Sequence, residues 1–160
     1  MQKSPIDLSV DQFNFIDIQR QLKAMASSGL KREMNRGLKE AVQPIVRAEQ
    51  AAARNLPSAG TGHTGLRESI AAAITVRLRT GVGDPGISVY AMEKKVRGKL
   101  GSDTNRSRGW RHPVFGNRDV WVGQVMSPRW WEDTYKPHLP DVRDRVLRVL
   151  VDVASKIARH

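Results

Sequence analysis

An amphipathic stretch from Leu30 to Leu56 constrains the fold of this chain more than any other feature. Its apolar residues recur at steps of three and four, which places them on one face of an α-helix: Leu30, Met34, Leu38, Ala41, Val42, Ile45, Ala48, Ala52 and Leu56. The other face is charged, with Lys31, Arg32, Glu33, Arg36, Lys39, Glu40, Arg47, Glu49 and Arg54. Burial of the apolar face must offset the entropy of ordering the helix, so we expect the helix to lie against another layer.

Pro44 interrupts this helical pattern. Its ring nitrogen has no hydrogen to donate to the carbonyl of Glu40, and the ring clashes with that carbonyl. Because the apolar residues continue past Pro44 in register, the pattern predicts a kink. The alternative is two separate helices that meet at Gln43.

Shorter elements surround the long helix and predict an α+β fold, in which a small antiparallel sheet packs against the long helix and a C-terminal helix. Alternation of apolar and polar residues indicates strands at 6–10, 74–78, 87–91 and 120–126. In the strand at 74–78, Ile74, Val76 and Leu78 face one way. Further helices are predicted at 13–25, at 66–72 with Thr64 as its cap, and after Pro128.

The last predicted helix follows Pro140, a residue suited to a first helical turn. One stripe of this helix is apolar, formed by Val142, Val146, Leu150, Val153 and Ile157. Leu147, Val149, Val151 and Ala154 widen the stripe, which predicts a helix more buried than an ordinary surface helix. We expect the stripe to pack on the helix that carries Leu38, Val42 and Ile45, or on the sheet.

Residues 93–111 have no regular pattern and are rich in glycine, serine and cations. All seven cations of this stretch are candidates for contact with DNA: Lys94, Lys95, Arg97, Lys99, Arg106, Arg108 and Arg111. Only Glu93 and Asp103 oppose them. The composition predicts a mobile basic loop, and long loops of this kind in compact domains are usually functional or disordered.

Length and composition set the remaining bounds. A chain of 160 residues fits one domain, 1–160, with a substantial core. It has no cysteine, so disulfides and cysteine-based metal sites are excluded. No apolar run reaches the roughly 20 residues that span a bilayer, and Met1 to Pro5 do not resemble a secretory signal, so we expect no membrane partner and synthesis in the cytoplasm. The net charge of +11 favours an acidic partner, either nucleic acid or an acidic protein surface.

Little in the sequence indicates catalysis. The histidines, His63, His112, His138 and His160, have no second ligand at a metal-binding spacing. The glycines from Gly81 to Gly86 are not followed by the Lys-Ser/Thr pair of a phosphate-binding loop. We therefore expect a protein that is not an enzyme and that uses neither a metal nor a cofactor.

Adjacent tryptophans, Trp130 and Trp131, follow Pro128. On a helix their side chains point about 100° apart, so we expect one to pack inside and the other to be available to a neighbouring molecule. The alternative is that both are buried in a small satellite core. Together with Tyr135 and Phe115, this pair is the candidate subunit or partner interface.

Three motifs carry a resemblance to a known family. They are Thr64-Gly65-Leu66-Arg67-Glu68-Ser69-Ile70 with Pro57 ahead of it, His112-Pro113-Val114-Phe115-Gly116-Asn117, and Pro128-Arg129-Trp130-Trp131. In this order, between a long helix and a C-terminal helix, they resemble the tail-completion or head–tail connector (neck) proteins of long-tailed bacteriophages. The resemblance covers about Leu30 to Ala158. It departs from the family at Asn117, where threonine is usual, and in the length of the basic loop.

The resemblance implies a non-enzymatic virion subunit that forms a homo-oligomeric ring, a hexamer, at the phage neck. Its expected partners are the head-side connector or stopper protein, the tail terminator or tail tube protein, and genomic DNA passing through the channel. It implies a location in the virion neck or tail, after assembly in the host cytoplasm. The alternative is a DNA-binding protein without sequence specificity that acts through the basic loop, which would bind with a steep salt dependence.

Overall fold

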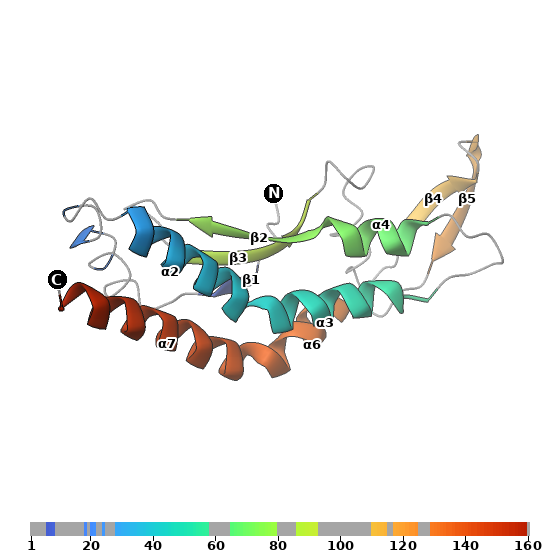
Figure 1. The fold of residues 1–160 in the computed structure, drawn as a ribbon. Helices are drawn as coiled ribbons and strands as arrows, with labels where there is room; N and C mark the ends of the chain where they lie inside the picture. Colours follow the sequence, from blue (N-terminus) through green and yellow to red (C-terminus); the bar gives the residue numbers. More distant parts are fainter. Residues whose placement is uncertain are drawn as a thin grey trace. The chain divides into compact units, whose positions relative to one another are not determined.

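The computed structural model describes residues 6–8, 18, 20, 21, 24, 28–57, 65–79, 86–92, 110–114, 117–124 and 129–159. Helices and strands both occur in this part of the chain, so the predicted α+β class is confirmed (Figure 1). The helices are α2 (Ser28–Ala41), α3 (Gln43–Arg54), α4 (Leu66–Ala73), α6 (Trp130–Tyr135), the 3₁₀ helix η2 (Lys136–His138) and α7 (Leu139–Ile157). The strands are β1 (Ile6–Leu8), β2 (Ile74–Arg79), β3 (Gly86–Ala91), β4 (Trp110–Val114) and β5 (Asn117–Gln124).

The chain forms two compact units. One unit contains 1–4, 47–75 and 91–137, and the other contains 5–46, 76–90 and 138–160. Each unit is assembled from segments that are distant in sequence, and α3 contributes to both. The single domain expected from chain length stays a prediction.

The long amphipathic stretch is divided at Val42, so the prediction of one kinked helix is wrong and the two-helix alternative holds. α2 ends at Ala41, Val42 forms a turn, and α3 begins at Gln43. The side-chain Nε2 of Gln43 donates to the carbonyl of Lys39 over 3.2 Å. Pro44 has no hydrogen to donate one residue further on, and the missing hydrogen bond explains why the helix breaks here.

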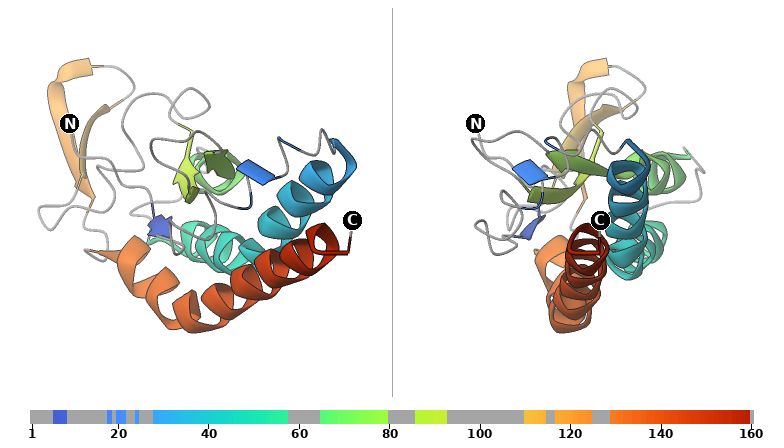
Figure 2. Two further views of the ribbon diagram at one scale, coloured as in Figure 1. Left: turned by 90° about the vertical axis from the view of Figure 1, so that its left-hand side faces the viewer. Right: turned by 60° about the vertical axis from the view of Figure 1, so that its left-hand side comes forward.

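α7 packs along α2 in the second unit, as predicted (Figures 1 and 2). Val142, Val146, Leu150 and Val153 of α7 are buried, as are Met34, Leu38 and Ala41 of α2. Gly37 permits the close approach, because a Cβ atom at this position would lie 3.0 Å from Cγ1 of Val149. Lys156 of α7 also pairs with Glu33 of α2.

α7 is less buried than the sequence predicted. Leu147 is 46% exposed and Val151 is 64% exposed, and Ala154 is exposed as well. The buried side chains of Val142, Val146, Leu150 and Val153 already make the contact with the rest of the unit. Residues about 100° further around the helix therefore face away from this contact.

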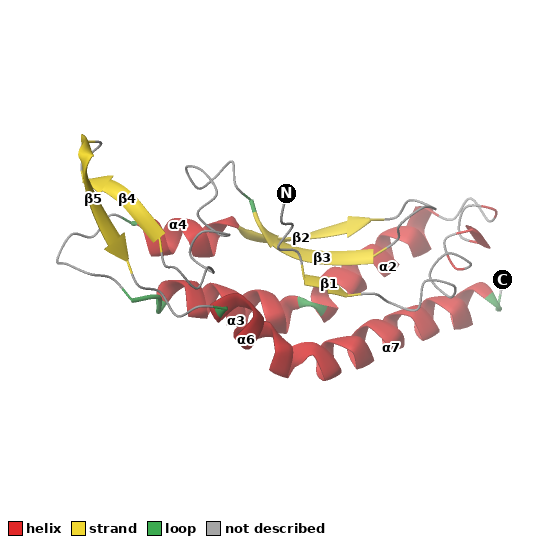
Figure 3. Ribbon diagram, turned by 180° about the vertical axis from the view of Figure 1, so that it is seen from behind, coloured by secondary structure: helices red, strands yellow, loops and turns green. Residues whose placement is uncertain are grey.

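The two sheets differ in size (Figure 3). β3 lies between β1 and β2, and β1 pairs with it in antiparallel register, with Ile6 opposite Val89. Ile87 and Val89 of β3 are fully buried. In β2 the predicted alternation is weak, because only Ile74 is buried, and Val76 and Leu78 are half-buried.

β4 and β5 form a separate antiparallel pair with a register shift between Pro113 and Val114. The predicted basic loop extends too far, since Trp110 and Arg111 belong to β4. The strand predicted at 120–126 begins earlier, at Asn117. A bulge explains how Pro113 is accommodated, because proline cannot donate to a regular ladder.

α4 forms two turns where the sequence predicted one, and it begins after Gly65. Gly65 has a φ of +64°, a left-handed conformation that glycine adopts without strain. The predicted cap, Thr64, lies outside the described residues. Of the helix predicted at 13–25, the described residues Ile18, Arg20, Gln21 and Ala24 are helical.

Candidate functional site

The residues predicted to form sites fall into three groups. Trp130, Trp131 and Tyr135 lie together on α6, and Arg111 lies in β4. The other predicted residues are outside the described part of the chain: Phe115, Lys94, Lys95, Arg97, Lys99, Arg106 and Arg108. Their proposed contacts with a partner or with DNA therefore stay predictions.

The two tryptophans of α6 are both buried, each with 6% of its surface exposed. Their rings meet edge to face, with centroids 5.5 Å apart and planes at 87°. This geometry lets two consecutive indoles occupy one buried site, although they leave the helix in different directions. The alternative, in which both tryptophans are buried, holds, and the prediction that one is available to a neighbour is wrong. Tyr135, which is half-buried, stays a candidate contact.

The start of α6 combines an unusual backbone conformation with a buried ring nitrogen that has no partner among the described residues. Arg129 precedes the helix with a φ of +64°, and no side chain caps the helix. Thr134 donates through Oγ1 to the carbonyl of Trp130 over 2.6 Å. The nitrogen of the Trp130 ring is buried and has no hydrogen-bond partner within the described structure. Such a buried donor is unusual, because most buried polar groups are satisfied.

Glu49 of α3 is the second unusual buried group, and it lies in the same unit as α6. Its side chain is completely buried, and neither carboxylate oxygen has a hydrogen-bond partner among the residues described. The periodicity of the long helix predicts Glu49 on its charged face, away from the core, and this prediction is wrong. The break at Val42 explains the error, because the buried residues of α3 follow a different line from those of α2.

A carboxyl group in this environment favours its neutral form. Burial, with a contribution from the charge of Glu132, raises the pKa of Glu49 from 4.5 to about 9. The pKa of Tyr135 is raised by burial and also by the charges of Glu132 and Glu49. Glu49 is therefore protonated at neutral pH, and its hydroxyl can donate one hydrogen bond.

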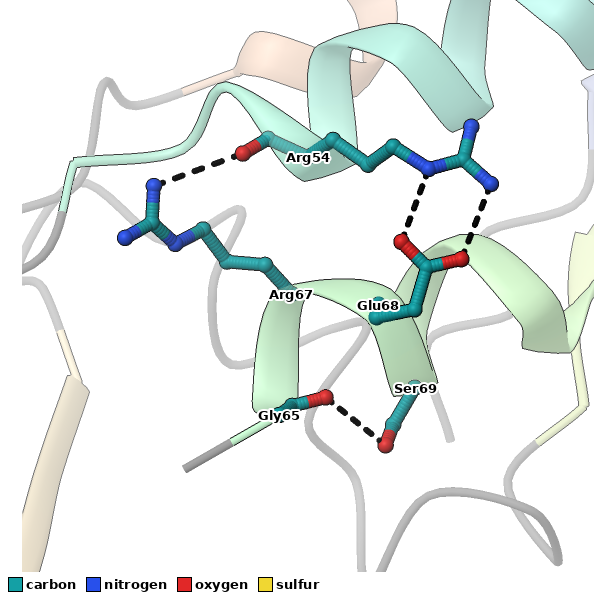
Figure 4. Close-up of polar contacts among 5 residues, drawn as sticks. All are labelled: Arg54, Gly65, Arg67, Glu68 and Ser69. Carbon is teal, nitrogen blue, oxygen red and sulfur yellow. Dashed lines mark hydrogen bonds and ion pairs between the residues drawn. The ribbon is translucent and has the colours of Figure 1, made fainter. Parts of the chain in front are cut away.

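An ion pair joins the end of α3 to α4 in this unit (Figure 4). Nε and Nη2 of Arg54 donate to the two carboxylate oxygens of Glu68 over 2.8 and 3.0 Å. Arg67 donates to the carbonyl of Arg54 over 3.4 Å, and Ser69 donates through Oγ to the carbonyl of Gly65 over 2.9 Å. These contacts give the Thr64–Ile70 motif a local role in the fold.

The surface of α7 carries apolar residues that the core does not use. Leu147 and Val151 are one helical turn apart, roughly 6 Å along the axis, and both are largely exposed. Ala154 and Ala158 continue the line and are also exposed. We call these four residues the α7 stripe. The sequence showed that these residues are apolar. It did not show that other residues of α7, Val142, Val146, Leu150 and Val153, would pack against the core in their place.

Comparison of the chain with models of protein families, with curated proteins and with solved structures finds no match. Among the described residues, no three side chains of histidine, cysteine, aspartate or glutamate are grouped as a metal site would need. No described helix is both long enough and apolar enough to cross a membrane.

Proposed function

We propose that this chain is a structural subunit of the neck of a long-tailed bacteriophage. Copies of it would form a ring that joins the head connector to the tail and leaves a channel for DNA. The motivation from sequence is the order of three motifs between two long helices. The observation in the structure that supports the proposal best is the exposed α7 stripe.

The α7 stripe suits contact with a second copy of the chain. Leu147 and Val151 are 46% and 64% exposed, and Ala154 and Ala158 add small side chains that let another surface approach closely. Grouped apolar residues on a surface mark sites of protein interaction more often than isolated ones do. A ring subunit needs such a surface in every copy, because a head-to-tail interface joins two different patches of identical chains.

The decisive experiment compares two double variants by size-exclusion chromatography with light scattering and by electron microscopy. Leu147→Gln with Val151→Gln removes the apolar character of the stripe. Arg148→Gln with Ser155→Gln changes exposed residues that flank the stripe, leaves its four apolar residues in place and serves as the control. We expect rings from the wild type and the control, and monomers with an unchanged circular dichroism spectrum from the stripe variant.

Two results would contradict the proposal. One is a wild-type chain that stays monomeric at every concentration. The other is ring assembly that survives both stripe substitutions. The six-fold copy number and the neighbouring neck proteins remain parts of the proposal that images of the ring, alone and on virions, would test.

A further inference from the structure

The exposed side of α2 carries cations with little opposing charge. Lys31, Arg32, Arg36 and Lys39 are all exposed. The carboxylate of Glu33, whose side chain is 40% exposed, is paired with Lys156 of α7. The other carboxylate of this described helix belongs to Glu40, whose Oε1 lies 4.0 Å from Nε of Arg36. Both of these side chains are more than 70% exposed, so water screens the pair strongly. We call the four cations the α2 basic face.

α7 shows that an exposed helix in the same unit can balance its charges. Arg145 donates to Asp141 over 2.7 Å, and Lys156 lies 2.8 Å from Asp152. Both are pairs of residues four positions apart, a spacing that stabilises an exposed helix. The α2 basic face has one loose pair for its four cations, so most of its positive potential is directed to solvent.

Two shallow hollows meet on this face of α2. The larger, of about 400 Å³, is lined by Arg32, Asn35, Arg36, Lys39, Glu40 and Gln43. The smaller, of about 270 Å³, is lined by Gly29, Arg32, Glu33 and Arg36. Arg32 and Arg36 therefore border both hollows, and each guanidinium can present several donors to an anion beside it.

The exposed residues of α2 indicate which class of anion fits. They are Ser28, Gly29, Lys31, Arg32, Arg36, Lys39 and Glu40, and none of them is apolar. A protein partner would normally be held by buried aromatic or aliphatic anchors, and a membrane surface would need apolar side chains to insert. A phosphate backbone needs only cations and hydrogen-bond donors.

We propose that the α2 basic face binds the phosphate backbone of double-stranded DNA without reading its sequence. The segment from Lys31 to Lys39 is roughly 12 Å long at 1.5 Å per residue. One DNA strand presents one phosphate per roughly 3.4 Å of duplex axis, so three to four phosphates fall within about this axial length. The number of cations therefore matches a short run of one strand. This inference does not depend on ring assembly, because a monomer presents the same face.

Two triple variants test the proposal. Arg32→Gln, Arg36→Gln and Lys39→Gln remove three charges from the α2 basic face. Arg143→Gln, Arg148→Gln and Arg159→Gln remove three exposed charges from the end and surface of α7, so both variants have the same net charge. Binding is measured by fluorescence anisotropy on two labelled duplexes of equal length and unrelated sequence, between roughly 50 and 200 mM salt.

The wild type should bind both duplexes alike. The α2 variant should lose more than about tenfold in affinity at low salt, and the slope of log affinity against log salt should become shallower by about 2.7. The α7 variant should change neither quantity by more than a small fraction of this. Equal losses in the two variants, no binding by the wild type, or a preference for one sequence would each overturn the proposal.

Discussion

Replacing Glu49 with glutamine should stabilise the protein at neutral pH. The side chain is fully buried, neither oxygen has a partner among the described residues, and its pKa is about 9 in place of 4.5. In the unfolded chain this carboxyl ionises above pH 4.5, whereas in the folded chain it keeps its proton up to about pH 9. The folded state therefore binds one more proton than the unfolded state across this range.

The sign of the effect follows directly. A raised acid pKa makes its full contribution to stability below pH 4.5 and loses it as the pH rises toward 9. Each pH unit in this range lowers the free energy of unfolding by about 1.4 kcal/mol. At pH 7 the accumulated loss is on the order of 3 kcal/mol, a large part of the 5–15 kcal/mol that stabilises a typical domain.

Glutamine has nearly the shape and polarity of a protonated glutamate, and it cannot ionise. Glu49→Gln should match the wild type near pH 4.5 and exceed it by about 3 kcal/mol at pH 7. The assay is urea denaturation followed by circular dichroism from pH 4.5 to 8.5. Glu40→Gln makes the same change at an exposed position and controls for the loss of one negative charge. A gap between Glu49→Gln and the wild type that stays constant with pH would refute the reasoning.

Three further predictions concern packing and local contacts. Leu150→Ala should lower the free energy of unfolding by about 2–5 kcal/mol, measured by denaturation, because the side chain is only 3% exposed. Gly37→Leu should overpack the α2–α7 contact and cost about 1–3 kcal/mol, since even a Cβ there would lie 3.0 Å from Val149; Val149→Ala should restore part of the loss. The hydrogen bond from Arg54 lowers the pKa of the Glu68 carboxyl. The ion pair therefore stabilises the folded protein above pH 4.5, and this stabilisation is lost as the pH falls through the lowered pKa. The protection factors of the α4 amides, which correct for the slower intrinsic exchange in acid, should therefore fall in acid for the wild type and much less for Glu68→Gln.

The helices were largely predictable because their periodicity is local and strong. The packing of α7 on α2 could also be predicted from sequence, because each helix has an apolar stripe of similar length that must be buried. The burial of Glu49 did not follow. The sequence contains a second line of residues at steps of three and four, Val42, Val46, Glu49, Ala53 and Leu56, and four of its five members are apolar. Glu49 is charged and stands in the middle of this line, so the line did not resemble a buried helix face.

After the break at Val42, most buried residues of α3 follow the second line of residues. On a continuous helix, the residues from Leu30 to Leu56 would bury Ala48 and Ala52, but these alanines are only half-buried. In α3 the buried face is centred roughly 60° away from the expected one, at 100° per residue. Ile45 is buried as the first line predicts, whereas Val46, Glu49 and Ala53 follow the second, and periodicity alone does not predict this shift after the break.

The candidate site was harder to predict than the helices, because it depends on contacts that are not visible in the local sequence. Adjacent tryptophans looked too divergent for one core, yet an edge-to-face contact buries both. Trp110 and Arg111 were assigned to the basic loop because residues 93–111 have no regular pattern and are rich in glycine, serine and cations. Their pairing with Gln124 and Gly123 is visible only once β5 is in place. Strand pairing of this kind depends on residues outside any local window.

The two surfaces proposed here have different chemistry, and this difference makes them separable. The exposed residues of α2 include cations and no apolar side chain, whereas α7 combines balanced charges with the α7 stripe. Both helices belong to one unit and are held together through Gly37 and Val149. If copies join through the α7 stripe, each copy adds one α2 basic face, and DNA affinity should rise with ring size through repeated weak contacts. The stripe variant should then bind DNA as a monomer does, more weakly than the ring but with its α2 contacts intact. The α2 variant should form rings that bind DNA poorly.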